Sequence, residues 1–184
     1  MNKRAGDIVL FKVKAKHLWK SPLSFLIGLF QGSRCTHTAI LSEPSNSVVV
    51  EAWWPLCRAH AIDYDLYEIA FIRPKLITEG EQISAAMTAR RMIGTKCAYD
   101  EPALIGLAKF FLIERFLGIP IRKAFYNTDS PDKYFCSELV AVCYMMAGFS
   151  LASLLGFKDY SQITPSDFER QIDKFTIIER TEGW

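Results

Sequence analysis

The sequence lacks the short motifs that assign a cofactor or a metal at sight. It has no G-x-G-x-x-G segment and no Walker-type phosphate loop, so a bound dinucleotide or nucleoside triphosphate is not indicated. Its five cysteines, at positions 35, 57, 97, 136 and 143, include no C-x-x-C pair. Neither a zinc knuckle nor a disulfide framework is therefore indicated, and a reducing compartment is the simplest setting. We expect no cofactor and no metal site.

The chain also lacks an excess of either charge. Its 184 residues include 22 basic and 20 acidic side chains, for a formal net charge of +2, and these are spread through the sequence. Nucleic-acid-binding domains normally carry a clustered basic stripe. Because no such stripe is present, we expect no nucleic-acid partner.

No long apolar run is free of charge. The longest apolar stretch, Ala103 to Ile121, carries Lys109, Glu114 and Arg115, which makes it a poor bilayer-spanning segment. We expect no transmembrane segment, and we interpret 103–121 as an apolar helical insertion that packs on the domain. Two alternatives stay open, namely a helix in peripheral contact with a membrane and a lid over an apolar substrate.

The first residues give no sign of secretion. Met1 to Asp7 contains no apolar h-region and no small-residue cleavage site, and it leads directly into a strand-like run. We therefore expect no signal peptide, and the cytoplasm is the default location.

What is present indicates a single α+β domain over residues 1–184. Hydrophobic residues make up 50% of the chain, which is ample for one packed domain and thin for two. A β-rich centre is followed by segments with helical spacing, an order that is typical of α+β proteins. We expect strands over residues 7–13, 36–41, 47–53, 66–73 and 175–180, and helices over 83–93, over 137–147 and from Thr164 onward.

Cys136 is the strongest candidate for a nucleophile. It lies in the segment YFCSE at 134–138, where an extended run turns into an amphipathic helix that ends at Gly148. The unpaired N–H groups and the partial positive charge at a helix start favour a thiolate over a thiol and can hold an oxyanion. The competing interpretation is a buried cysteine that packs as a small hydrophobe.

A thiol nucleophile needs a base, and the chain has only three histidines. His37 lies on the first strand of a predicted hairpin whose five-residue turn over 42–46 places it directly opposite Glu51. Glu51 would then accept the imidazole N–H, as the carboxylate of a catalytic triad does. A one-residue slip would send Glu51 to the other face, leaving an ordinary strand histidine. His60, in a predicted loop, and His17, in a lysine-rich surface stretch, are weaker candidates.

These residues resemble a known family, the circularly permuted relatives of the NlpC cell-wall peptidases, in particular the YiiX/YaeF-like permuted papain-fold amidases. The resemblance covers most of the chain and rests on GDIVL at 6–10, THTAI at 36–40, VEA at 50–52, YD at 99–100, YFCSEL at 134–139 and ITPSD at 163–167. In the permuted group the histidine strands come first and the cysteine helix comes late, as they do here. The resemblance implies a permuted papain-like fold, in which a small antiparallel sheet packs against the helix that carries the nucleophilic cysteine.

The resemblance also implies a role for each site residue. Cys136 would be the nucleophile, His37 the general base and acid, and Glu51 the residue that orients the imidazole. Tyr99 and Asp100 look like the family's Tyr-Asp pair before the nucleophile helix and are candidates for the substrate-binding pocket. The alternative is that Tyr99 only packs and Asp100 only begins a turn.

The implied activity is that of a cysteine hydrolase, a thiol amidase or peptidase that cleaves an amide or peptide bond through a thioacyl intermediate. A cell-wall peptide is one such substrate by analogy. One alternative is a lipid acyltransferase or phospholipase on the same fold, although the chain lacks the Asn-Cys-Glu-His-Phe context of the relatives that resemble lecithin:retinol acyltransferase. The other is a non-catalytic binding module.

Overall fold

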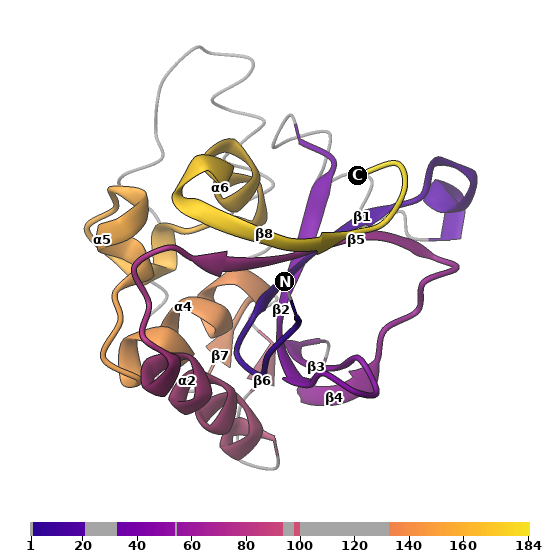
Figure 1. Ribbon diagram of the computed structural model, residues 1–184. Coiled ribbons are helices and arrows are strands. Elements are labelled where there is room, and N and C mark those ends of the chain that lie inside the picture. The colour runs from indigo at the N-terminus through magenta and orange to yellow at the C-terminus, as the bar shows by residue number, and fades with distance from the viewer. Residues whose placement is uncertain (1, 21–32, 54, 94–97, 100–132) are drawn as a thin grey trace.

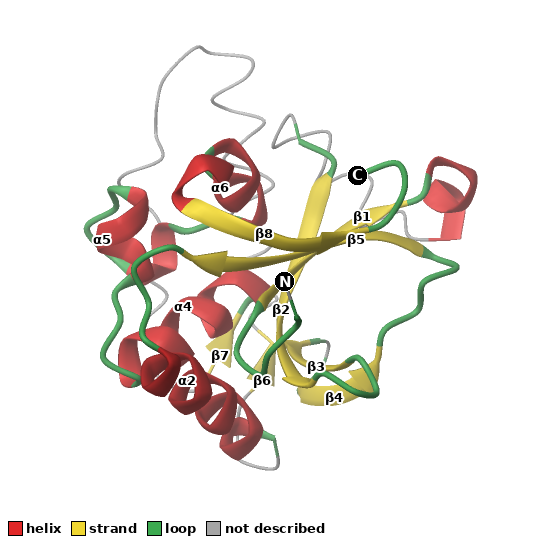
Figure 2. Ribbon diagram, in the orientation of Figure 1, coloured by secondary structure: helices red, strands yellow, loops and turns green. Residues whose placement is uncertain are grey.

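A computed structural model describes residues 2–20, 33–53, 55–93, 98–99 and 133–184. Within them a six-stranded antiparallel sheet is flanked by helices, so the predicted α+β class is confirmed (Figures 1 and 2). No helix among these residues is long and apolar enough to cross a bilayer. The predicted insertion at 103–121 lies outside them.

The main sheet runs in the order β4-β3-β2-β1-β5-β8, and every neighbouring pair is antiparallel. A second, two-stranded parallel sheet pairs β6 with β7. The strands are β1 (Ile8–Val13), β2 (Cys35–Glu43), β3 (Val48–Ala52), β4 (Cys57–Ala61), β5 (Tyr67–Pro74), β6 (Ala98–Tyr99), β7 (Lys133–Tyr134) and β8 (Phe175–Arg180).

Four α-helices are described: α2 (Glu79–Met92), α4 (Cys136–Met146), α5 (Leu151–Leu155) and α6 (Pro165–Arg170). Helices α2 and α4 pack against each other, and both contact β2, as α6 does (Figure 1). Short 3-10 helices cover Ala15–Lys20, Tyr160–Gln162 and Ile172–Lys174. Strand β2 is thus the element on which the helices converge.

The two faces of the sheet belong to two separate cores. Ile8 and Leu10 of β1 join the core that includes buried residues of α2 and α4, whereas Val9 and Phe11 join a second core on the other face. This alternation follows from the period of two along a strand. His37 pairs with Phe11 across β1 and β2, and their ring centroids are 5.5 Å apart, so His37 lies on the face of the second core.

The start of α4 is fixed to the chain segment that precedes α6. The hydroxyl of Ser137 is fully buried and donates to the carbonyl of Ile163 across 2.6 Å. At the far end of the helix, Gly148 has φ +94°, a left-handed conformation that glycine adopts without strain. The helix end predicted at Gly148 is confirmed. These two anchors set the position of Cys136, the first residue of the helix.

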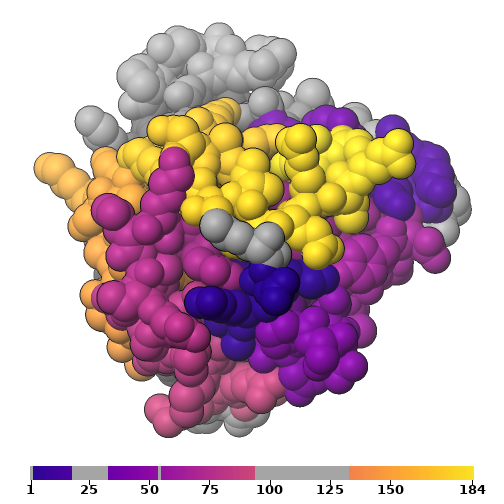
Figure 3. Space-filling model, in the orientation of Figure 1, coloured from indigo at the N-terminus to yellow at the C-terminus, as the bar shows by residue number. Residues whose placement is uncertain are grey.

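The N-terminal Gly6-Asp7 pair ties the chain start to α2 and β5. Gly6 has φ +91°, and a Cβ atom there would lie 2.1 Å from the carbonyl oxygen of Gln82. The buried carboxylate of Asp7 accepts from Arg73 Nε at 2.8 Å and from Gln82 Nε2 at 2.6 Å. Figure 3 shows the first described residues, in indigo, at the surface between α2 and the C-terminal residues, whereas Gly6 and Asp7 themselves are buried. The GDIVL motif at 6–10 therefore has a structural role.

Most predicted elements lie where the sequence placed them. The strands expected over 66–73 and 175–180 occur within one residue of those bounds, and α6 starts after Thr164 as predicted. Helix α2 begins at Glu79 rather than Ile83, because Thr78 and Glu81 form a capping box in which Thr78 N donates to Glu81 Oε2 at 2.8 Å.

Two expectations are wrong in the region after β3. Residues 57–61 form strand β4 rather than the predicted loop. Cys57, at the start of that strand, is disulfide-bonded, so the expectation that the cysteines form no disulfide fails at this position. Cys35, Cys136 and Cys143 are free thiols.

Candidate active site

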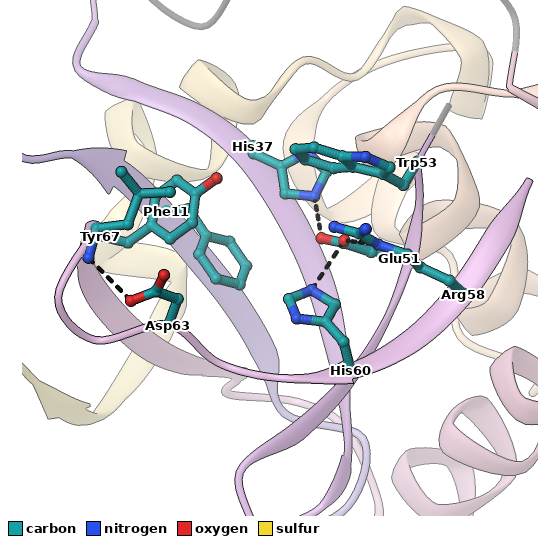
Figure 4. A pocket seen from close by; sticks show the side chains of 9 residues that line it. Phe11, His37, Glu51, Trp53, Arg58, His60, Asp63 and Tyr67 are labelled. Atoms are coloured by element: carbon teal, nitrogen blue, oxygen red, sulfur yellow. Dashed lines mark hydrogen bonds and ion pairs between the residues drawn. The ribbon is translucent and has the colours of Figure 1, made fainter. Parts of the chain in front are cut away.

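Three of the predicted site residues converge at the start of α4. His37 comes from β2, Glu51 from β3 and Cys136 from the first turn of α4. Nε2 of His37 lies 2.6 Å from Oε2 of Glu51 (Figure 4), and the His37 side chain also interacts with the Cys136 thiol, since each shifts the pKa of the other toward its charged form. Because Nε2 is engaged by Glu51, Nδ1 is the ring nitrogen left for the sulfur.

The hairpin that carries His37 and Glu51 differs from the predicted register by two residues. Leu41 pairs with Val49, whereas the predicted five-residue turn would have paired Ala39 with Val49. The strands continue past the expected turn: the register shifts between Leu41 and Glu43, and Glu43 pairs with Val48. This irregularity has the form of a β-bulge, which a turn-length argument from sequence does not anticipate.

A two-residue shift preserves the faces of both strands, because the side-chain period is two. Glu51 therefore stays on the face of His37, but as a diagonal rather than a directly opposed neighbour. Trp53 lies close instead, with its ring centroid 5.6 Å from that of His37 in an edge-on arrangement. The prediction that His37 and Glu51 lie directly opposite each other is wrong. The prediction that they share a face of the sheet is correct, and this is enough for their 2.6 Å contact.

Cys136 lies in a buried environment rich in hydrogen-bond donors. Only 6% of the residue is exposed. Besides His37, the neighbouring Thr38 lowers the pKa of the Cys136 thiol. The N-cap residue is Phe135, whose side chain has no acceptor for the N–H groups of the first turn. The sulfur therefore sits where donors and the helix dipole favour a thiolate.

The charges of the three residues reinforce one another. Burial would raise the pKa of the Cys136 thiol, but the charge and hydrogen bond of His37, together with Thr38, lower it. Burial would lower the pKa of His37, but Cys136 and Glu51 raise it to about 10. Burial would raise the pKa of Glu51, but His37 and His60 hold it well below its usual range. All three pKa shifts favour the charged form of the residue, which gives a thiolate–imidazolium pair beside a carboxylate.

Two residues that the sequence argument ranked low or did not consider also contact Glu51. Arg58 Nε donates to Glu51 Oε1 at 2.8 Å, and His60 Nε2 lies 2.8 Å from the same oxygen (Figure 4). Both come from β4, in which Arg58 pairs directly with Glu51. The alternation of Arg58 and His60 with small residues in CRAHA at 57–61 is a period-two signal that could have indicated this strand.

A cavity of about 240 Å³ lies beside the Glu51 carboxylate (Figure 4). It combines aromatic rings with charged side chains, and the guanidinium carbon of Arg58 lies 4.3 Å from the centroid of the Trp53 ring. Cys136 is not among its lining residues, so the cavity reaches the base and the carboxylate rather than the sulfur. The lining residues are Phe11, His37, Glu51, Trp53, Arg58, His60, Asp63, Leu66 and Tyr67.

The predicted substrate-binding pair is only partly within the described residues. Tyr99 lies on β6, and its backbone pairs with Tyr134 of β7, two residues before Cys136. Asp100 lies outside the described residues. The pairing brings the chain at Tyr99 to the segment that leads into the nucleophile helix, and a pocket role for Tyr99 and Asp100 stays a prediction.

No family model matches the chain, and a search of curated proteins finds no match. Among the described residues, no cluster of three or more histidine, cysteine or acidic side chains is arranged to hold a metal ion. The geometry of Cys136, His37 and Glu51 is therefore the feature that bears on function.

Proposed function

We propose that the protein is a cysteine hydrolase, an amidase or peptidase of the permuted papain-like type that cleaves an amide or peptide bond. Cys136 acts as the nucleophile, His37 as the general base and acid, and Glu51 as the residue that orients the imidazole. The observation that carries the proposal is the 2.6 Å contact between His37 Nε2 and Glu51 Oε2, together with the mutual electrostatic stabilisation of His37 and the buried Cys136 thiol. Buried ionisable groups are costly, and active sites are where such arrangements concentrate.

The order of the elements supports the permuted papain-like assignment. The histidine strand β2 and the carboxylate strand β3 precede the cysteine helix α4 in the chain, and α4 packs against both strands. This is the order that the resemblance to permuted NlpC relatives implies. Because α4 packs on β2, the proposed nucleophile Cys136 lies near the proposed base His37, and no cofactor is needed to bring them together.

In the first step the Cys136 thiolate attacks the substrate carbonyl and forms a carbon–sulfur bond. Backbone N–H groups in the first turn of α4 are the donors placed to hold the resulting oxyanion. The His37 imidazolium gives its proton to the leaving nitrogen, the carbon–nitrogen bond breaks, and an amine departs. The acyl group remains on Cys136 as a thioester.

In the second step water releases the acyl group. Neutral His37 takes a proton from the attacking water, the carbon–sulfur bond breaks, and a carboxylic acid leaves. The proton on His37 and the negative charge on the Cys136 sulfur restore the starting ion pair. Throughout the cycle Glu51 accepts a hydrogen bond from the Nε2–H of His37, which fixes the tautomer and leaves Nδ1 to exchange protons with the substrate.

Trapping of the thioester tests the proposal directly. The protein is incubated with p-nitrophenyl acetate, quenched in acid, and the acetylated cysteine is identified by peptide mass spectrometry. We expect an acetyl group on Cys136, released with time in the wild type, and none on that position in Cys136→Ser or His37→Ala. Cys143 and Cys35 serve as internal controls because both are free and buried.

Absence of acetylation at Cys136, or equal acetylation in wild type and His37→Ala, would contradict the proposal. Where the thioester forms, a panel of peptide amides and of acyl esters matched in their acyl groups then separates amidase from esterase chemistry. The proposal predicts release of amine from the amide series at a rate that His37→Ala abolishes. Turnover of lipid esters alone would favour the acyltransferase or phospholipase alternative.

A further inference from the structure

The carboxylate of Glu51 has more partners than an orienting residue requires. One oxygen, Oε2, faces His37 Nε2 at 2.6 Å. The other, Oε1, lies 2.8 Å from Arg58 Nε and 2.8 Å from His60 Nε2. The residue is only 1% exposed. Within the described part of the chain, three cationic or protonatable groups therefore meet at one buried carboxylate.

The two nitrogens of His60 both face acceptors. Nδ1 hydrogen-bonds the carbonyl oxygen of Ala61 at 2.7 Å, and that oxygen cannot donate; Nε2 lies 2.8 Å from a carboxylate oxygen as an ion pair without regular hydrogen-bond geometry. An imidazole that faces two acceptors satisfies both only when each nitrogen carries a proton. The geometry therefore fits the imidazolium form of His60, anchored to its own strand at one nitrogen and to Glu51 at the other.

The position of His60 follows from strand β4. Arg58 and His60 are two residues apart on that strand and so present side chains to the same face. Arg58 is directly paired with Glu51 in the β3–β4 ladder. The His60 side chain is 28% exposed and that of Arg58 is 45% exposed, so the contact from His60 is the less screened of the two.

We propose that His60, assisted by Arg58, is a positioning residue that holds Glu51 Oε1 so that Oε2 is presented to His37. Without a partner on Oε1, the carboxylate can turn about its terminal torsion, which is broad for glutamate. With Oε1 occupied from β4, the rotamer that meets His37 is the one retained. The catalytic consequence rests on the proposed function of Cys136, whereas the contact between Glu51 and His37 is open to measurement without it.

Loss of the Nε2 proton of His60 would weaken this arrangement. The Nδ1–H would still donate to the Ala61 carbonyl oxygen, and the lone pair of Nε2 would then face Glu51 Oε1. The contact with the Glu51 carboxylate raises the pKa of His60, although burial opposes the rise. The other charged and titratable groups that line the cavity with His60 are His37, Glu51, Arg58, Asp63 and Tyr67.

Two substitutions separate positioning from charge. His60→Gln removes the charge but keeps an N–H donor for Glu51, whereas His60→Leu keeps comparable bulk and removes the donor. We expect alkylation of Cys136 by iodoacetamide near pH 6 to fall about fivefold in His60→Leu and to stay within about twofold of wild type in His60→Gln, because a lost charge-assisted hydrogen bond has effects of this order. His17→Gln is the matched control, since that histidine does not line the cavity.

A spectroscopic readout tests the inference independently of reactivity. The proton between His37 Nε2 and Glu51 Oε2, across 2.6 Å, should give a strongly downfield imidazole NMR resonance. We expect this resonance in wild type, His60→Gln and His17→Gln, and its loss or broadening in His60→Leu at a temperature where circular dichroism shows each variant folded. If His60→Leu does not fold, the comparison is made with His60→Ala.

Three results would overturn the inference. The first is an unchanged resonance and unchanged alkylation in His60→Leu. The second is an equal loss in His60→Gln and His60→Leu, which would assign the effect to charge. The third is faster alkylation in both variants, as expected if the His60 charge merely competed with His37. A wild-type Cys136 of ordinary reactivity would instead contradict the proposed function, and the resonance would still decide the role of His60.

Discussion

Cys136 and Cys143 lie on the same helix, two turns apart and on nearly the same side, and both are buried free thiols. Their environments differ completely. The sulfur of Cys143 lies 3.9 Å from the sulfur of Met92, and burial raises the pKa of its thiol to about 12. Cys136 is equally enclosed, yet its pKa is lowered because His37 and Thr38 contact the sulfur. Neighbouring charges and donors, rather than burial, thus distinguish a candidate nucleophile from a core residue.

The substitution His37→Ala should have the largest effect on the difference in reactivity between Cys136 and Cys143. Without the imidazolium, the largest influence that offsets the burial of the Cys136 sulfur is lost, so its thiol should become protonated near neutral pH. We expect the alkylation rate of Cys136 near pH 6 to fall on the order of 100-fold, because a thiol with a pKa of about 8.5 or higher is almost wholly protonated there. Alkylation followed by peptide mass spectrometry checks this, with His17→Ala as the control. A loss smaller than threefold would contradict the role of His37.

Glu51→Gln should have the next largest effect. The amide leaves His37, Arg58 and His60 without their common anion, so His37 loses part of the stabilisation of its charged form. We expect Cys136 alkylation near pH 6 to fall about tenfold, the effect of one lost charge-assisted contact. Equal rates in Glu51→Gln and wild type would show that the carboxylate does not sustain the ion pair.

The same variant should show the effect of Glu51 on stability. Since the folded-state pKa of Glu51 is lowered, its contribution to stability is present above the unfolded value of about 4.3 and is lost as the pH falls through the folded value. The difference in melting temperature between wild type and Glu51→Gln should therefore be largest near neutrality and shrink below about pH 4. Thermal melts followed by circular dichroism across this range provide the measurement. A difference that does not depend on pH would contradict the assigned charge.

Thr38→Val should have a smaller effect on the same sulfur. Valine keeps the shape and the backbone N–H of Thr38 but removes a buried hydroxyl that helps to lower the pKa of the Cys136 thiol and has no hydrogen-bond partner within the described residues. We expect about a threefold loss in Cys136 alkylation near pH 6, the effect of one weak polar interaction. Thr36→Val, which also removes a buried hydroxyl from β2, is the control, and a loss of equal size in that variant would argue against a specific effect of Thr38.

Cys143→Ser should leave the reactivity of Cys136 unchanged and lower stability. The serine hydroxyl would be buried in a site whose nearest partner is a thioether, which costs about 1–3 kcal/mol when unsatisfied. Cys143→Ala, which introduces no polar group, separates this cost from that of lost packing. Thermal unfolding measures the stability, and alkylation tests whether Cys136 is affected. A drop in Cys136 reactivity would mean that the two thiols are not independent.

The sequence predicted the elements whose signals are local. Strand β8 has the predicted bounds, and the Thr164-Pro165-Ser166-Asp167 start of α6 is a capped helix start because its hydrogen bonds lie within four residues. The start of α4 at Cys136 could be placed for the same reason. What sequence reasoning missed depends on non-local pairing, namely the hairpin bulge and strand β4 with Arg58 and His60.

The meeting of His37 and Glu51 was predicted from an incorrect register, and it survives because the error was two residues rather than one. The contact between Glu51 and His60 could not be predicted from the register of this hairpin. His60 contacts the carboxylate only because a third strand, short and at the edge of the sheet, pairs with β3. Edge strands carry the weakest patterns, since their side chains need not be apolar.

The measurement that tests the central claim most directly is the pH dependence of iodoacetamide alkylation at Cys136 and Cys143 in the wild-type protein, resolved by peptide mass spectrometry. Both thiols are read in the same sample, and Cys57 keeps its disulfide under non-reducing conditions. We predict that Cys136 reaches a plateau well below the ordinary thiol pKa of about 8.5, while Cys143 stays unmodified until the protein unfolds. Alkylation of Cys136 that rises only around or above that value, or that follows Cys143, would contradict the thiolate–imidazolium pair and the hydrolase built on it.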